Sequence, residues 1–148
     1  MESLSLFPAT LTLVAANVLA SLYAWLNPAF LMSNVFDIAA IREKREWHRL
    51  VTSGFLHLNT FHLFINMFVL FQFGAVVETT IGTAGFLIVY AASLLGGNLW
   101  ALLENFRTPT YRALGASGAV SGVVFSFCLF APLTLLWIFF ILPLPAFV

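Results

Sequence analysis

The chain has 148 residues, of which 61% are hydrophobic and only 8% are charged. Because an ordinary soluble domain carries about 25% charged residues, this composition excludes a soluble globular domain and indicates an integral membrane protein. The formal net charge is zero and the six basic residues form no extended patch, which excludes a nucleic-acid partner.

Stretches free of Asp, Glu, Lys and Arg divide the chain into candidate membrane spans, because a crossing helix needs about 20 apolar residues. Backbone groups that face lipid must be paired within their own segment, so we expect these spans to be helices. The last uncharged stretch is too long for one span, and Pro132 is the natural break in it. The expected helices cover about residues 7–31, 57–77, 82–103, 115–131 and 133–148.

A charged connection separates the first two expected spans, over residues 32–56. It contains Trp47 and His48 among charged side chains of both signs. Two interpretations stay open: a solvated loop with a tryptophan anchor, or a segment that lies in the membrane interface.

Three polar side chains lie at the start of the second expected span. His62 and Asn66 are four residues apart and share a helix face, whereas His57 lies just before the helix. Polar groups at membrane depth face protein or water, so these side chains either bond to neighbouring helices or take part in chemistry. Without a carboxylate or thiolate beside them they are a poor zinc set, and we expect no metal.

Ser117 lies between small residues at the head of an apolar segment, in the run Gly115-Ala116-Ser117-Gly118. The unpaired N–H groups and positive dipole end of a helix start stabilise a developing negative charge. A serine nucleophile also needs a base and exclusion of bulk water. His62 and Asn66 supply candidate hydrogen-bond donors, and by residue type alone His62 serves equally well as the base.

Two small-residue features follow Ser117 in the same segment. Gly118 and Gly122 are four residues apart, a spacing that lets another helix backbone approach closely. Cys128 has no second cysteine to pair with, and we interpret it as an inert packing residue.

Taken together, these residues resemble the signature series of the rhomboid intramembrane serine proteases. Order and spacing agree over about residues 42–122. The matching positions are Glu46-Trp47-His48-Arg49-Leu50-Val51-Thr52, then His57, His62, Asn66 and Met67, then Glu78, then Gly115-Ala116-Ser117-Gly118.

The resemblance implies an all-α, polytopic bundle of at least six transmembrane helices, five of them in this chain. We therefore expect residues 1–148 to form a single rhomboid-like transmembrane domain that is incomplete at its C-terminus. The implied activity is that of a serine-type endopeptidase that cleaves transmembrane substrate proteins inside the lipid bilayer, without a cofactor or metal. We expect a multi-pass protein of the plasma (inner) membrane of a prokaryote.

The resemblance also assigns roles to residues. Ser117 matches the nucleophile, and His62 and Asn66 match side chains that stabilise the oxyanion together with the backbone N–H of the serine. This makes His62 a donor and not the base. The supporting positions match the nearby structural histidine His57, the glycines Gly115 and Gly118, Arg49 of the half-submerged first loop, and Glu78, which helps to hold the far end of the second helix.

One expected residue has no match. The family base is a histidine on a sixth helix, and no histidine follows Ser117 in this sequence. Because a serine hydroxyl is a poor nucleophile without an adjacent base, we expect little turnover from these 148 residues alone. The alternative is a non-catalytic rhomboid-like membrane protein that binds transmembrane helices through the face formed by Gly118 and Gly122.

The charge distribution and the family resemblance predict opposite orientations in the membrane. Four of the basic residues lie in the first connection, and Arg107 and Arg112 lie in the third. The positive-inside rule would place both connections in the cytoplasm. The resemblance implies a site that opens on the opposite side, and we follow it because a loop folded into the interface with paired charges is not the free loop that the rule counts.

Overall fold

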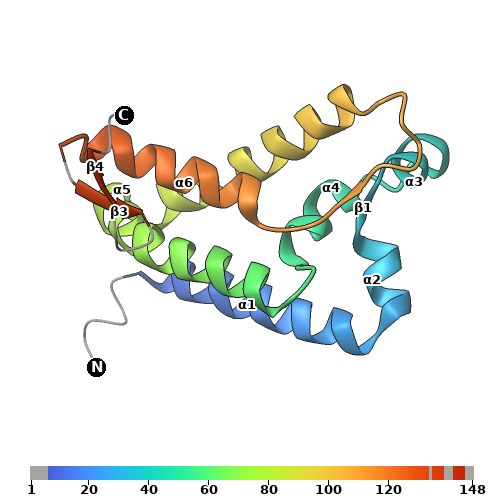
Figure 1. Cartoon of the computed structure of the whole chain (residues 1–148), viewed down its shortest axis with the longest axis horizontal. Coiled ribbons are helices and arrows are strands. Elements are labelled where there is room, and N and C mark those ends of the chain that lie inside the picture. The colour runs from blue at the N-terminus through green and yellow to red at the C-terminus, as the bar shows by residue number, and fades with distance from the viewer. Residues whose placement is uncertain (1–6, 134, 139–141, 146–148) are drawn as a thin grey trace.

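The computed structural model describes residues 7–133, 135–138 and 142–145. Its long helices are α1 (Pro8–Leu26), α5 (Thr60–Glu104) and α6 (Ser117–Phe130), as Figure 1 shows. By length and apolar composition α1 and α5 can each cross a membrane, and α6 is a shorter apolar helix. Both α1 and α6 pack against α5.

Helix α5 consists of two arms joined at Gly82. This residue has φ 77° and ψ 162°, a backbone conformation that essentially only glycine adopts. The chain reverses direction here, so the first arm (residues 60–81) and the second arm (residues 83–104) run back past each other (Figure 1). At 1.5 Å per residue each arm is about 33 Å long, which matches the thickness of a bilayer core. The arms confirm the expected helices over 57–77 and 82–103.

The first expected span is shorter than predicted. α1 ends at Leu26, and α2 (Pro28–Asn34) begins after a break at Asn27. The Asn27 side chain caps α2, because its Oδ1 accepts from the Phe30 N–H at 3.0 Å. Pro28 takes the first helical position, where its missing N–H costs nothing. An uncharged stretch therefore overestimates a span when it contains a capping residue followed by proline.

Helix α6 confirms a helix within the expected range 115–131, although it is shorter than predicted. The fifth expected helix, over 133–148, is wrong where the structure describes it. The chain there forms β3 (Leu135–Ile138) and β4 (Leu142–Pro145), which pair antiparallel. Pro143 and Pro145 have no N–H to donate, and proline disfavours a helix over the residues before it. The described part of the chain is mostly helical, with two short pairs of strands.

The first connection is a folded layer and not the loop of the first interpretation, although Trp47, His48 and residues 42–45 in it are exposed. After α2 it contains four short elements and a small core of its own. Phe36, Ile38 and Ile41 are fully buried there and pack with Leu102 near the end of α5. The elements are β1 (Phe36–Asp37), α3 (Ile38–Lys44), α4 (Arg49–Thr52) and the 3₁₀ helix η2 (Ser53–Phe55).

Arg49 holds this layer together from inside. Its Nη1 donates to the carbonyl oxygens of Met32 at 2.9 Å and Val35 at 2.7 Å, which ties the end of α2 to α4. The buried guanidinium also pairs with Glu46 at 2.6 Å. A buried arginine is tolerable only when its charge and donors are satisfied, and both conditions are met here.

A small sheet of two strands, each two residues long, joins the first connection to the segment before Ser117. β1 pairs antiparallel with β2 (Arg112–Ala113), with Phe36 opposite Ala113 and Asp37 opposite Arg112. Asp37 also caps α3, since its Oδ1 accepts from the Ala40 N–H at 3.0 Å. Its Oδ2 pairs with Arg112 Nε at 2.7 Å.

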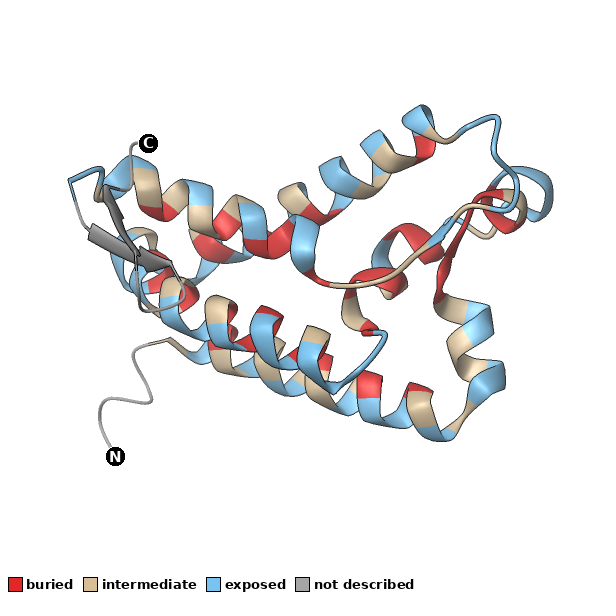
Figure 2. Ribbon diagram, viewed as in Figure 1, coloured by how far each residue is buried: buried red, intermediate tan, exposed pale blue. Residues whose placement is uncertain are grey.

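The main core lies where the arms of α5 meet α1 and α6, and Figure 2 shows the buried residues along the facing sides of these helices. The outer faces carry large exposed apolar side chains instead of charges. Such a surface suits lipid and not water. Examples exposed by at least 60% are Leu19, Phe61, Phe64, Ile88, Phe125 and Leu129.

The glycine face of α6 is already covered by the second arm of α5. A Cβ on Gly122 would overlap Ser93 Oγ, and a Cβ on Gly118 would lie 3.9 Å from the Cα of Gly97. Close backbone approach through small residues is the expected packing of membrane helices. This face therefore serves contacts within the chain.

Glu78 fastens the far end of the bundle. Its Oε1 accepts from the Ala9 N–H at 2.9 Å and the Thr83 hydroxyl at 2.8 Å. Its Oε2 accepts from the N–H and the hydroxyl of Thr10, at 2.7 and 2.8 Å. The carboxylate thus caps the start of α1 and links it to both sides of the Gly82 turn.

We expect Glu78→Gln to lower the free energy of unfolding by about 3 kcal/mol, because the amide nitrogen would face N–H and O–H donors in a buried place. Unfolding of the full-length protein in mixed detergent micelles measures this loss. Glu104→Gln changes an exposed carboxylate at the end of α5 and should be neutral. Equal stability of the two variants would contradict the role of Glu78.

Candidate active site

Ser117 is the first residue of α6, and its side chain is exposed. The preceding residue, Ala116, provides no side-chain cap, and no other side chain in the described part of the chain bonds to the N–H groups of the first turn. Among the described residues none forms a hydrogen bond with Ser117 Oγ. An exposed hydroxyl therefore lies beside uncapped N–H groups at the positive end of a helix.

Gly115 brings the His62 ring against the chain just before Ser117. It has φ 129°, and its N–H donates to the Ser53 carbonyl at 3.0 Å. A Cβ at this position would lie 2.7 Å from His62 Cε1 and 3.1 Å from His62 Nε2. Backbone conformation and lack of space both require glycine here.

The first turn of α5 places His62 and Asn66. Asn59 caps the helix by accepting from the His62 N–H at 2.8 Å, and Asn66 Nδ2 donates to the His62 carbonyl at 2.9 Å. Asn66 is buried and His62 is half-buried. Within the described chain no hydrogen bond engages the His62 ring, and one Asn66 Nδ2 proton suffices for its bond, so each side chain retains an N–H to donate.

His57 holds the residue before Ser117 in place. It is fully buried, and its Nε2 accepts from the Ala116 N–H at 3.4 Å. An accepting Nε2 has no proton, so the neutral ring carries its proton on Nδ1 and donates it to Ser21 Oγ, 3.0 Å away. Ser21 in turn donates to the Phe55 carbonyl at 3.1 Å.

This network connects α1 to the start of α6. Besides Ser21, α1 supplies Trp25, whose Nε1 donates to the His57 carbonyl at 2.8 Å. Sequence analysis missed both residues, although a serine inside an apolar span is a signal for an internal hydrogen bond.

Asn98 is a third residue that sequence analysis missed. From the second arm of α5 its Nδ2 donates to the Leu50 carbonyl at 2.7 Å and to Ser53 Oγ at 3.3 Å. Because the Ser53 carbonyl accepts from the Gly115 N–H, Asn98 stabilises a residue that positions the chain just before Ser117. A lone amide in an apolar span marks such a position.

The structure brings some predicted residues together and separates others. His57, His62, Gly115 and Ser117 gather at the start of α6, and Asn66 lies one turn along α5 from His62. The remaining predicted residues lie away from Ser117 or serve packing. Arg49 lies inside the first connection, Glu78 lies beside the Gly82 turn of α5, and Gly118 contacts the second arm.

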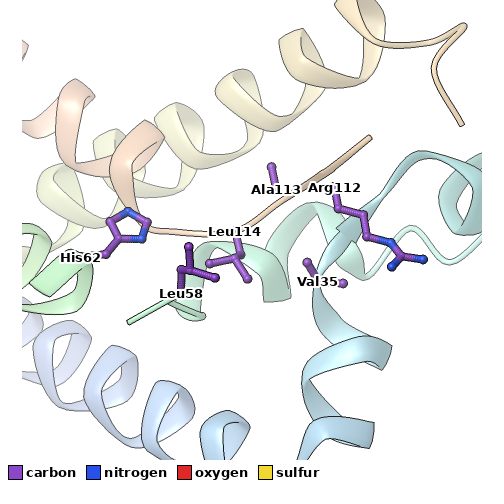
Figure 3. Close-up of a pocket in the computed structure, with 6 residues that line it drawn as sticks. All are labelled: Val35, Leu58, His62, Arg112, Ala113 and Leu114. Atoms are coloured by element: carbon purple, nitrogen blue, oxygen red, sulfur yellow. The ribbon is translucent and has the colours of Figure 1, made fainter. Parts of the chain in front are cut away.

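A pocket of about 320 Å³ adjoins His62 (Figure 3). His62 lies at one end of the labelled group and Arg112 at the other, with aliphatic side chains between them. The segment from Arg112 to Leu114 forms one wall and continues into Gly115. The six lining residues are Val35, Leu58, His62, Arg112, Ala113 and Leu114.

Burial, and to a lesser extent the His62 ring 5.1 Å away between centroids, lower the pKa of His57 to about 4. The folded protein therefore keeps His57 neutral at ordinary pH, as its hydrogen bonds require. In the unfolded chain the same side chain titrates near pH 6.5.

We expect the thermal stability of the protein in detergent to fall as the pH drops from about 6.5 to about 4, since only the unfolded state gains the His57 proton in this range. The loss amounts to at most about 3 kcal/mol. His57→Gln should flatten this slope, whereas His48→Gln, at an exposed histidine, should retain it. An unchanged slope in His57→Gln would contradict the neutral, buried state.

Known proteins are similar to this chain over the part that contains the candidate site. Residues 44–148 match the Rhomboid domain family. The chain is 28% identical over 165 residues to "RHOMBOID-like protein 12, mitochondrial" of Arabidopsis thaliana, which covers 99% of this chain and 48% of the relative.

Two further relatives match shorter stretches. "Rhomboid protease GluP" of Bacillus subtilis is 36% identical over 77 residues, covering 52% of this chain and 14% of the relative. "Rhomboid-like protein 11, chloroplastic" of Arabidopsis thaliana is 39% identical over 77 residues, covering 52% of this chain and 27% of the relative. The chain spans less than half the length of these relatives. The family match covers most of the chain, which is therefore a membrane protein that belongs to the Rhomboid domain family.

Proposed function

We propose that this chain carries the nucleophile and the oxyanion donors of an intramembrane serine endopeptidase. The observation that supports this best is the start of α6, where an exposed Ser117 lies beside uncapped N–H groups and His62 packs against Gly115. Relatives named as rhomboid proteases support the same reaction class.

In this proposal Ser117 Oγ attacks the carbonyl carbon of a peptide bond, and a base removes the hydroxyl proton. The resemblance gives the base as a histidine on a sixth helix. No described side chain forms a hydrogen bond with Ser117 Oγ, so we assign this role to none of the described residues. His57 does not qualify, because its Nε2 is occupied by the Ala116 N–H.

The negative charge that forms on the carbonyl oxygen needs preorganised donors. We assign three of them: the backbone N–H of Ser117, the His62 ring and Asn66 Nδ2. The Ser117 N–H lies in the uncapped first turn, and the two side chains come from adjacent turns of α5. A low-dielectric setting among apolar helices strengthens each of these interactions.

The substrate class follows from the surroundings of the site. The outer faces of the helices are apolar, so a protein that reaches Ser117 from the bilayer arrives as a transmembrane segment. A helix hides its carbonyl groups in internal hydrogen bonds, and the cleaved segment must therefore unwind before Ser117 can attack it.

The packing of α6 does not favour the alternative function, a non-catalytic protein that binds transmembrane helices through Gly118 and Gly122. The second arm of α5 occupies that face through Ser93 and Gly97. A pure binding protein also has no use for an exposed serine at an uncapped helix start.

We expect Ser117→Ala to abolish cleavage of a transmembrane substrate by the full-length protein. His62→Ala and Asn66→Ala should each lower kcat by about 10²–10³, the usual cost of losing one oxyanion donor. A cleavage assay in vesicles measures these rates, with Ser126→Ala as a control further along the same helix. Wild-type rates in all three variants would refute the assigned roles.

Gly115→Ala should lower kcat by about 10² or more while the protein remains folded, because the new Cβ displaces the His62 ring and strains a positive φ. Gly96→Ala is the matched control, since a Cβ there meets no atom within 4 Å. Cleavage rates and thermal midpoints of both variants check the prediction, and wild-type kcat in Gly115→Ala would count against the placement of His62.

A further inference from the structure

We propose that Arg112 makes the pocket beside His62 selective for a substrate side chain that carries a carboxylate. This inference rests on the proposed function, because it names a preference of the same site. Of the six described residues that line the pocket, Arg112 is the one with a permanent charge.

The guanidinium of Arg112 is held in place on one side only. Its Nε pairs with Asp37 Oδ2 at 2.7 Å, and Asp37 is fixed in turn by the Ala40 N–H and by the pairing of β1 with β2. The Arg112 side chain is 55% exposed, and its Nη groups form no hydrogen bond with any described residue. A guanidinium used at Nε still presents the pair of Nη groups that grips a carboxylate with two parallel hydrogen bonds.

Asp37 limits how strong the preference can be. Burial alone would raise the pKa of this carboxyl group, but the hydrogen bond from Ala40 and the charge of Arg112 hold its pKa below the ordinary value. Asp37 is therefore ionised at neutral pH and offsets part of the Arg112 charge. We expect a preference of about fivefold, in the range of one partly exposed charged hydrogen bond.

The pocket also sets the position and type of the preferred residue. Arg112 precedes Ser117 by five residues, so an extended chain separates their Cα atoms by at most about 17 Å. A substrate residue that reaches Arg112 thus lies within about five residues of the bond that Ser117 attacks. Leu58 and Leu114 line the space between, which favours glutamate because its methylene groups can pack on them.

A lipid phosphate offers the same oxygen geometry to an arginine. We assign the site to a peptide carboxylate because the pocket has apolar walls and leads to His62 and onward to Gly115. A lipid headgroup bound to Arg112 at the edge of the pocket would contact neither the apolar walls nor His62.

The test uses the full-length protein in phosphatidylcholine vesicles. Model transmembrane substrates carry neutral residues within five positions of the cleaved bond, except for one Glu or Gln placed at each position in turn. We expect kcat/KM to be about fivefold higher for Glu than for Gln at one position. Arg112→Gln should abolish the difference, Arg112→Lys should keep part of it, and Arg107→Gln, at an exposed arginine of the same connection, should leave it intact.

Equal rates for Glu and Gln at every position would overturn the inference, as would a preference that survives Arg112→Gln. If Arg112→Gln changes rates only in vesicles that contain anionic lipid, and equally for both substrates, Arg112 binds a headgroup and the inference is wrong. Thermal midpoints of the variants show whether the Asp37 pair is needed for folding, and Arg112→Lys keeps the test valid if Arg112→Gln unfolds.

Failure of the proposed function gives a different result. In that case no substrate is cut, or cutting continues in Ser117→Ala. The inference is then tested by binding: labelled Glu and Gln substrates should differ about fivefold in Kd for the Ser117→Ala protein, and equal Kd values would overturn it.

Discussion

The candidate site depends on one buried histidine. His57 accepts the Ala116 N–H and donates to Ser21, so a single neutral ring joins the start of α6 to α1. Both hydrogen bonds require the same tautomer, and protonation would break the bond to Ala116. Because Ala116 directly precedes Ser117, the position of the hydroxyl depends on His57 and, through Ser21, on α1, and not on α6 alone.

The remaining polar groups follow the rule that bonds inside a membrane must be internal. Glu78 satisfies the start of α1, Asn98 satisfies Leu50 beneath the first connection, and Arg49 satisfies two carbonyl groups at the end of α2. The start of α6 differs from these positions, because no described side chain caps its first N–H groups. Uncapped N–H groups beside Ser117 are the feature that a transition state could use.

Sequence predicted the helices that charge boundaries and length define. The roles that it assigns to His62, Asn66 and Ser117 stay predictions, and the structure adds that His57, His62 and Gly115 lie close together at the start of α6. Sequence did not predict the break at Asn27 or the folded first connection, because a capping bond and a small core depend on tertiary contacts. Ser21 was missed for the same reason: its role exists only once α1 lies beside His57. The fifth helix was wrong because apolar composition outweighed two prolines in the prediction.

The most direct test of the account is to react the full-length protein with a serine-directed fluorophosphonate and locate the adduct by peptide mass spectrometry. The account predicts one adduct, on the peptide that contains Ser117, and none in Ser117→Ala, because Ser117 alone among the described serines combines an exposed hydroxyl with an uncapped helix start and adjacent candidate oxyanion donors. An adduct on Ser53, Ser93 or Ser121 instead, or no adduct at Ser117, would contradict it.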